Sequence, residues 1–405
     1  MTLDRATVVL FDVDGVLIEP GGYRCAMRDA MRHFLQRLGQ PHWQPDESFV
    51  EQFESHMLTS EWDMLPLTLC HFLDHALHHI EPAHPWQTLA DAAANIAQHP
   101  AMPAPTQLFA VIDQIGAIVA GRSGNPSLWI YESRSQADFP FPRLCSHPVL
   151  TSLLAHTRDI QRSETMRIFQ QYIIGSDNFR TYYHTEPDLD LPNYLTLHDT
   201  VPLKPEAFQA LQQKIDSREL FISIYTARPS MPPAGISPNG DGAYSPEAEQ
   251  AAGLLPWHGV YLSAYGKVYW LAQQTSFHPE ELLKPSPAQA LSAIAYHFTG
   301  DETRALLWAA DVFQASHTNT LTSAYAQCIS LPAQLVLHVF EDSPNGLSGG
   351  VQAASLLRAM GVEVDLHLWG ISANPVKQTA LRAQGGRVFS DVNQAVQQAL
   401  FACLV

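Results

Sequence analysis

Val8-Val9-Leu10-Phe11-Asp12-Val13-Asp14-Gly15 is the part of this chain that indicates its fold most directly. The apolar half is too short and too rich in β-branched residues for a helix, so it predicts a buried strand. Because side chains alternate along a strand, Asp12 and Asp14 should point to the same side. Two like charges at that spacing repel each other unless a cation or a proton separates them. The sequence therefore predicts metal-assisted carboxylate chemistry at the end of an N-terminal strand.

The composition is typical of a soluble globular protein. The 405 residues, 46% of them hydrophobic, allow one to three domains, and no apolar run is long enough to span a membrane. No signal peptide precedes the first strand, and the five scattered cysteines form no CxxC pair, so we expect a cytoplasmic protein with reduced, mostly buried thiols. The formal net charge of −17 argues against nucleic acid or an anionic membrane as partner.

Further short apolar segments predict a parallel sheet. Strands are expected at 220–225, 335–340 and 364–369, with a weaker candidate at 259–262. Helical patterns lie between them, at 204–216, 286–297, 347–360 and 375–384. Strands that alternate with helices predict a doubly wound α/β sheet, in which right-handed crossovers bring the carboxyl ends of the strands to one edge.

The first two predicted strands are about 200 residues apart, which is far more than a crossover needs. We therefore predict an α/β core domain made of residues 1–18 plus 200–405, and a mainly α-helical domain inserted at 19–199. Apolar residues at helical spacing support the insert, at 23–39, 46–58, 64–80, 86–98, 105–119 and 148–173. The segment 229–256 is rich in Pro and Gly and predicts a long loop.

Polar residues with chemical potential follow other predicted strands or precede a predicted helix. Thr226 comes directly after the strand at 220–225, Lys284 precedes the helix at 286–297, and Glu341-Asp342 follows the strand at 335–340. Because strand ends in such sheets converge on one crevice, a hydroxyl, an ammonium and four carboxylates are expected to meet there.

In the order Asp12-x-Asp14-Gly15-Val16, Thr226, Lys284 and Glu341-Asp342, the chain resembles the haloacid dehalogenase (HAD) superfamily. The resemblance covers the predicted core and implies a Rossmann-like fold. The long helical insert after the first motif is similar to the cap domain of the C1 type. It is much longer than the caps of β-phosphoglucomutase-like members, so it implies no particular substrate.

The resemblance implies a role for each motif residue. Asp12 would be the nucleophile that forms an aspartyl-phosphate, and Asp14 would act as general acid and then as general base. Mg²⁺ would be held by the Asp12 and Asp342 carboxylates and the Asp14 backbone carbonyl, with Glu341 as a possible third carboxylate. Thr226 would hydrogen-bond a phosphoryl oxygen, and Lys284 would hold the same group as a point charge.

We therefore predict a Mg²⁺-dependent phosphatase that acts on a small phosphorylated metabolite. Asp14 favours phosphate-ester chemistry, because ATPases of the family carry Thr at that position and dehalogenases lack the acid. A sugar phosphomutase or phosphotransferase would use the same residues, and a catalytically idle HAD-like binding protein is a third interpretation. Two further features stay open. Arg228 is a candidate substrate contact, and the histidines that share one predicted helix face suit either a metal or a hydrated surface: His71, His75, His78 and His79.

Overall fold

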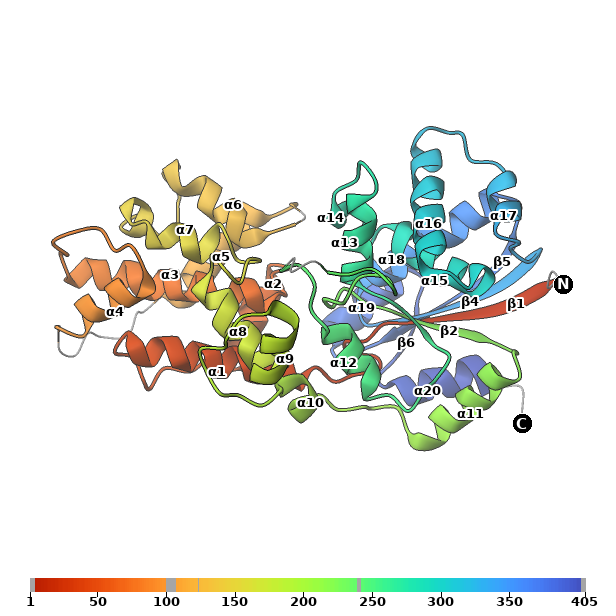
Figure 1. Ribbon diagram of the computed structural model, residues 1–405, viewed down its shortest axis with the longest axis horizontal. Helices are drawn as coiled ribbons and strands as arrows, with labels where there is room; N and C mark the ends of the chain where they lie inside the picture. The colour runs from red at the N-terminus through yellow and green to blue at the C-terminus, as the bar shows by residue number, and fades with distance from the viewer. Residues whose placement is uncertain (1–3, 100–106, 123, 239–241, 402–405) are drawn as a thin grey trace. The chain divides into compact units, whose positions relative to one another are not determined.

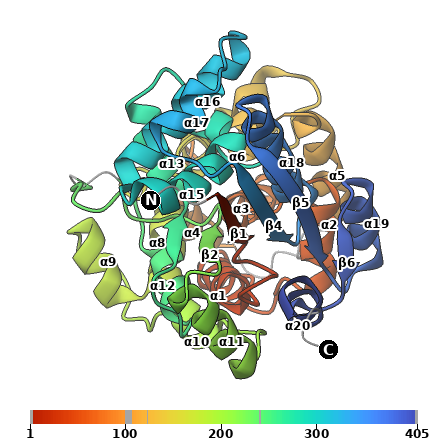
Figure 2. The same ribbon diagram turned by 90° about the vertical axis from the view of Figure 1, so that its right-hand side faces the viewer.

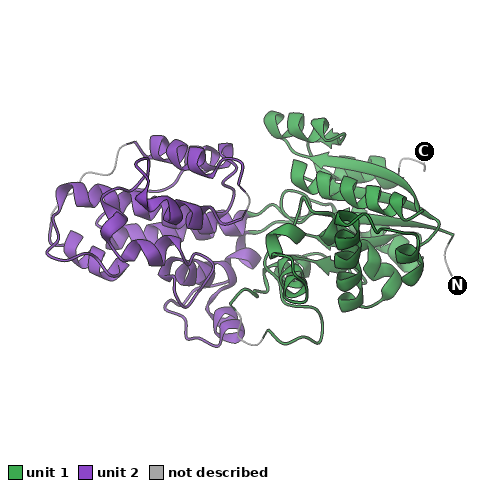
Figure 3. Ribbon diagram, turned by 90° about the horizontal axis from the view of Figure 1, so that it is seen from above, with its two compact units in different colours: residues 1–20, 199–405 green, residues 21–198 purple. Residues whose placement is uncertain are grey.

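The computed structural model describes residues 4–99, 107–122, 124–238 and 242–401 of the chain. The chain divides into two compact units (Figure 3). Unit 1 comprises Met1–Pro20 and Asp199–Val405, and unit 2 comprises Gly21–His198. Unit 1 is therefore discontinuous in sequence, and the whole of unit 2 is inserted after its first strand.

Unit 1 is built on a six-stranded parallel sheet with the strand order β3-β2-β1-β4-β5-β6. The strands are β1 (Arg5–Phe11), β2 (Phe221–Tyr225), β3 (Tyr261–Ser263), β4 (Gln334–Glu341), β5 (Glu363–Ile371) and β6 (Arg387–Phe389). The prediction of an α/β fold with a parallel sheet is confirmed, and the strand order is that of a Rossmann-like core. The order reverses between β1 and β4, which makes the space beyond their carboxyl ends the expected ligand crevice.

Helices cover both faces of this sheet (Figures 1 and 2). Val8 and Leu10 of β1 belong to an apolar cluster with α15 (Pro287–Thr299) and α18 (Pro344–Ala359). Val9 and Phe11 belong to a second cluster with α11 (Pro205–Asp216) and α20 (Val392–Val396). Both faces of β1 are therefore buried, and this is why its sequence is a continuous apolar run. The helices of unit 1 are α11 (Pro205–Asp216), α12 (Glu247–Gly253), α13 (Tyr265–Gln273), α14 (Pro279–Leu282), α15 (Pro287–Thr299), α16 (Glu302–His317), α17 (Ala324–Cys328), α18 (Pro344–Ala359), α19 (Pro375–Ala383) and α20 (Val392–Val396), followed by a π-helical turn at Gln397–Phe401.

The predicted long loop at 229–256 is corrected by the structure, because it contains helix α12. Ala248 and Ala251 of this helix are buried, and Glu247 is fully buried with its Oε1 accepting a hydrogen bond from Ser245. The helix formers of 247–252 outweigh the Pro and Gly residues on either side. Residues 239–241 of the same segment lie outside the described residues.

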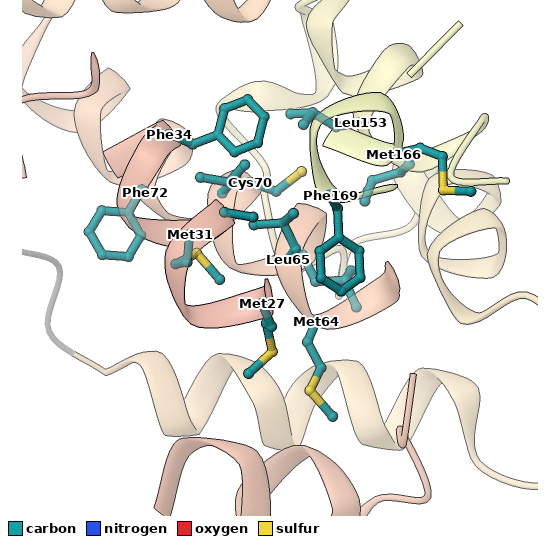
Figure 4. Close-up of a cluster of buried hydrophobic side chains, with 14 of the residues drawn as sticks. Met27, Met31, Phe34, Met64, Leu65, Cys70, Phe72, Leu153, Met166 and Phe169 are labelled. Carbon is teal, nitrogen blue, oxygen red and sulfur yellow. The ribbon is translucent and has the colours of Figure 1, made fainter. Parts of the chain in front are cut away.

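Unit 2 is helical, and its described residues contain no strand. Its helices are α1 (Gly21–Arg37), α2 (Glu47–Ser55), α3 (Glu61–His79), α4 (Leu89–Ile96), α5 (Leu108–Val119), α6 (Pro126–Glu132), α7 (Val149–Leu154), α8 (Glu164–Ile174), α9 (Ser176–Tyr183) and α10 (Tyr194–His198), with 3₁₀ turns at Ser133–Ser135 and Leu144–Ser146. Phe34 of α1, Leu65 and Cys70 of α3, Leu153 of α7 and Phe169 of α8 lie close together in its apolar core (Figure 4). A core of this kind lets the unit bury its own apolar surface.

The predicted helix at 148–173 is in fact two helices, α7 and α8. Asp159 accepts hydrogen bonds from the backbone N–H groups of Gln161 and Arg162, and Ser163 caps α8 by accepting one from Met166. These short polar side chains hold a turn between the two helices and begin the second helix. Residues 105 and 106, the start of another predicted helix, lie outside the described residues.

The cysteines of the described residues form no disulfide. Cys70 is buried and Cys25 partly buried, but Cys145 and Cys328 are exposed, so the prediction of mostly buried thiols is wrong for them. Cys403 lies outside the described residues. Within the described part of the chain, no helix combines the length and apolar character that a membrane crossing requires.

Candidate active site

The carboxyl end of β1 places Asp12 beside Glu341. Phe11 pairs with Phe340 across β1 and β4, and the Asp12 backbone N–H donates to the Phe340 carbonyl at 3.0 Å, which extends the ladder by one residue. The chain then folds back on itself, since the N–H groups of Leu17 and Ile18 both donate to the Val13 carbonyl. A tight turn therefore follows Asp12 at once and keeps Asp14 near the same edge of the sheet.

Two glycines let the polar groups approach the backbone closely. Gly15 has a φ of +73°, and a Cβ at that residue would lie 2.8 Å from Oδ2 of Asp342. A Cβ on Gly346, in the first turn of α18, would lie 1.9 Å from Oε1 of Glu341. Larger residues at these two positions would displace the carboxylates, so packing requires glycine at both, and the positive φ favours glycine at Gly15 as well.

Glu341 lies at the end of β4 and is completely buried. Its Oε2 accepts a hydrogen bond from Ser343, and Ser343 also caps α18 by accepting one from the Gly346 N–H. The helix cap is thus supplied by Ser343 and not by either carboxyl group.

Lys284 bridges two of the carboxylates. Its side chain is 9% exposed, and its Nζ lies 2.9 Å from Oδ1 of Asp12 and 2.5 Å from Oε1 of Glu341. The ammonium also lies over the ring of Tyr225, 3.8 Å from its centroid. Lys267, the other lysine in this part of the sequence, pairs with Glu302 instead. The structure therefore brings Lys284 to the acidic residues and leaves Lys267 outside this group.

Asp12, Glu341 and Asp342 form the one group with metal-binding potential among the described residues, each offering an oxygen within 4.8 Å of the others. Carboxylate oxygens are the ligands that Mg²⁺ prefers. The contacts of Lys284 and Ser343 use both oxygens of Glu341 but only Oδ1 of Asp12. The Asp14 carboxylate is not in this group, and neither are the histidines of α3. The donor set therefore fits a hard cation held chiefly by Asp12 and Asp342.

Burial and the closeness of the acidic residues shift the pKa values of several groups at this site. Burial raises the pKa of Glu341, and the nearby Asp12 charge raises it further, against the opposing effect of Lys284. Burial and the charge of Asp12 raise the pKa of Asp342 to about 6, although Lys377 acts in the other direction with its Nζ 3.3 Å away. Burial lowers the pKa of Lys284, but Asp12 and Glu341 outweigh it and raise that pKa above its ordinary value. Such shifts indicate that the acidic residues favour a further cation or a proton.

Thr226 lies one residue beyond β2 and is 1% exposed. Its Oγ1 accepts a hydrogen bond from the Arg228 backbone N–H at 3.1 Å, and its carbonyl accepts one from Gln289. The hydroxyl thus holds the turn that leads to Arg228. The described contacts connect Thr226 with the site through this turn.

Arg228 and Asp199 lie beside Asp14, although the sequence suggested only a substrate contact for Arg228 and no role for Asp199. The guanidinium donates from Nε and NH2 to the Asp14 carboxylate and from NH1 to Oδ2 of Asp199 at 3.0 Å. Arg228 is 3% exposed, and its guanidinium forms ion pairs with Asp14 and Asp199. Asp199 carries no motif signal, because its partner is 29 residues further along the chain.

Fold and site together define a class: an α/β protein with a Rossmann-like parallel sheet, in which carboxylates and a buried lysine meet where the strand order reverses. No family model matches the chain, and no curated protein sequence matches it either. Among solved structures, the X-ray structure of Northeast Structural Genomics Consortium target ZR25 is 15% identical, with a TM-score of 0.57 over 99% of both chains. Phosphatase Tt82 from Thermococcus thioreducens is 13% identical, with a TM-score of 0.40 over 94% of this chain and 100% of its own. The first comparison shows a shared fold, and the second is too distant to carry an argument.

Proposed function

We propose that this protein is a Mg²⁺-dependent phosphatase of the HAD type that hydrolyses a small phosphate monoester through an aspartyl-phosphate. The observation that carries the proposal is the meeting of Asp12, Lys284, Glu341 and Asp342 at the switch point of the sheet. Nucleophile, phosphate-binding cation and metal-binding acids are the groups that phosphoryl transfer requires, and the order of the motifs along the chain matches that family.

In the first step, an oxygen of Asp12 attacks the phosphorus, and the bond from phosphorus to the leaving oxygen breaks. Lys284 and the Val13 N–H, the latter at 2.8 Å, both hold Oδ1 of Asp12 and so fix the orientation of the attacking carboxylate. The leaving oxygen takes a proton from the Asp14 carboxylic acid and departs as an alcohol. The products of this step are the alcohol, the phosphorylated Asp12 and an ionised Asp14.

In the second step, water attacks the phosphorus of the phosphorylated Asp12 while Asp14 removes a proton from that water. The bond between phosphorus and the Asp12 oxygen breaks, which returns the carboxylate and releases inorganic phosphate. Asp14 holds the proton again at the end of the cycle. One ester and one water are consumed for each alcohol and phosphate formed.

Asp12 and Asp342 would hold Mg²⁺, together with the Asp14 backbone carbonyl. When bound, the ion offsets the repulsion between the carboxylates and the phosphate and stabilises the charge on the transferring group. Glu341 is better suited to orienting Lys284, because both of its oxygens are already hydrogen-bonded. Lys284 would hold the phosphoryl group electrostatically, and Thr226 would donate its hydroxyl proton to a phosphoryl oxygen.

The helical unit 2 would be the cap domain that selects the leaving group, and the protein would act in the cytoplasm. Both assignments rest on the HAD resemblance and on the sequence composition.

The test is a phosphate-release screen over sugar phosphates, nucleotides and phosphoglycolate, with Mg²⁺ and with EDTA. We expect release that EDTA abolishes and that Asp12→Asn removes, while Asp311→Asn on the exposed face of α16 leaves it unchanged. Brief turnover followed by acid quenching should trap a phosphoprotein that hydroxylamine cleaves, as an acyl phosphate requires. Release that survives EDTA would refute the metal assignment, and no release from any substrate would refute the phosphatase. Conversion of a hexose 1-phosphate without free phosphate would support a phosphomutase instead.

A further inference from the structure

We propose that Arg228, anchored by Asp199, is a positioning residue that orients the Asp14 carboxylate for proton transfer. The inference deepens the proposed function and rests on it. The structural basis is a buried chain of contacts that runs from Asp199 through the guanidinium to Asp14.

The guanidinium donates to both acids through different nitrogens. Nε lies 3.1 Å from Oδ1 and 3.0 Å from Oδ2 of Asp14, NH2 lies 2.5 Å from Oδ1, and NH1 lies 3.0 Å from Oδ2 of Asp199. A planar fork of this kind fixes the plane of a carboxylate, whereas a lysine ammonium fixes only a distance. Oδ1 of Asp14 takes two of the three contacts, which leaves Oδ2 as the atom best able to carry the proton.

The exposed fractions of the three side chains indicate which of them is fixed and which is oriented by the others. The side chains of Arg228 and Asp199 are 2% and 0% exposed, whereas that of Asp14 is 35% exposed. The backbone of Arg228 is also held, because its N–H donates to Thr226 Oγ1 and its carbonyl accepts from the Tyr265 N–H at 3.1 Å. Arg228 is thus a fixed element, and Asp14 is the accessible group that it orients.

A buried arginine between two carboxylates needs a reason, because desolvating the three charges is costly and an apolar replacement is often no less stable. Orientation supplies a reason, since a proton donor must lie within hydrogen-bond reach of the leaving oxygen. A misplacement of about 1 Å in such a group lowers turnover by roughly 100-fold.

The test is kcat/KM for a series of phosphate monoesters whose leaving groups range from 4-nitrophenol to simple alcohols. Proton donation matters most for the poorest leaving groups, so Arg228→Lys should lose about 10- to 100-fold on alkyl phosphates and far less on 4-nitrophenyl phosphate. Asp199→Asn should show the same dependence on the leaving group with a smaller amplitude. In an Asp14→Asn background, Arg228→Lys should cause no further loss.

Lys267→Met is the matched control, because it breaks another buried ion pair of unit 1, that with Glu302. We expect it to lower the melting temperature and to leave the dependence on the leaving group unchanged. If Arg228→Lys does not fold, the milder Asp199→Asn decides the question.

Two outcomes would overturn the inference while the phosphatase stands. One is a loss of equal size for every leaving group, and the other is a further loss from Arg228→Lys in the Asp14→Asn background. An inactive wild-type protein that forms no hydroxylamine-labile phosphoprotein would refute the proposed function itself, and this inference with it.

Discussion

Replacing Gly346 by alanine should disrupt the candidate site from within. The new Cβ would lie 1.9 Å from both Oε1 and the carboxyl carbon of Glu341, about 1.5 Å closer than ordinary van der Waals contact. The helix has little freedom to retreat, because the Gly346 N–H donates to Ser343 and the Gly346 carbonyl accepts a 2.6 Å hydrogen bond from the Tyr225 hydroxyl. Glu341 must therefore move, and a shift of that size separates it from Lys284.

The expected cost follows from these contacts. Overpacking of a well-packed core costs about 1–3 kcal/mol, and breaking a buried ion pair costs about 3–5 kcal/mol when one charge is left unpaired. Lys284 keeps Asp12 as a partner, so the second cost is only partly incurred. We expect Gly346→Ala to lower the free energy of unfolding of unit 1 by about 3 kcal/mol or more.

The measurement is urea unfolding, with hydrogen exchange of the peptides from β4 and α18 to assign the transition to unit 1, because two units need not unfold together. Gly253→Ala is the matched control, since this glycine ends α12, is exposed and has open space around the added Cβ. Alanine there should be neutral or stabilise by up to about 1 kcal/mol. A loss below about 1 kcal/mol for Gly346→Ala would refute the close contact between α18 and Glu341.

Three further expectations concern pH, the core of unit 2 and the metal. Burial lowers the pKa of His338 to about 4, so the folded state binds fewer protons than the unfolded state below the ordinary value of 6.5, and the free energy of unfolding should fall by up to about 3 kcal/mol as the pH drops from 6.5 to 4. Protonation also removes the acceptor for the Trp369 indole, so a His338→Gln variant with an equally steep pH dependence would contradict this account. Phe169→Ala should cost about 3–5 kcal/mol in thermal or urea unfolding, because the ring is fully buried, whereas Phe109→Ala, at a residue that is 45% exposed, should cost under about 1 kcal/mol, and similar losses would contradict the core assignment. Mg²⁺ should raise the melting temperature of the wild type but not of Asp342→Asn, and an equal rise in both would exclude Asp342 as a ligand.

Local patterns were sufficient for much of the sheet. The strands at 220–225 and 335–340 were predicted from short apolar runs, because a strand buried on both faces leaves that pattern in a few consecutive residues. The strand at 364–369 was predicted in the same way, although Asp365 in it is exposed. Helix ends were predicted less well. Whether the run at 148–173 makes one helix or two depends on Asp159 and Ser163, whose hydrogen bonds to the backbone a period of apolar residues does not reveal.

The candidate site was also predicted only in part from the sequence. Its acidic residues and Lys284 lie next to predicted strands or helices, so the rule that strand ends converge was enough to suggest their meeting. The partner of Asp14 was not predictable by that rule. Arg228 is 214 residues away from Asp14, and the sequence suggested only a substrate as its partner.

The amino-acid sequence alone determined the class of sheet, the large helical insert and the residue types available for chemistry, because those depend on periodicity and on neighbours in the chain. Only the tertiary structure decided which charges pair: Lys284 with Asp12 and Glu341, Lys267 with Glu302, and Arg228 with Asp14 and Asp199. A buried charge must find a partner somewhere, but which partner it finds depends on the strand order and on the segments that pack between distant parts of the chain.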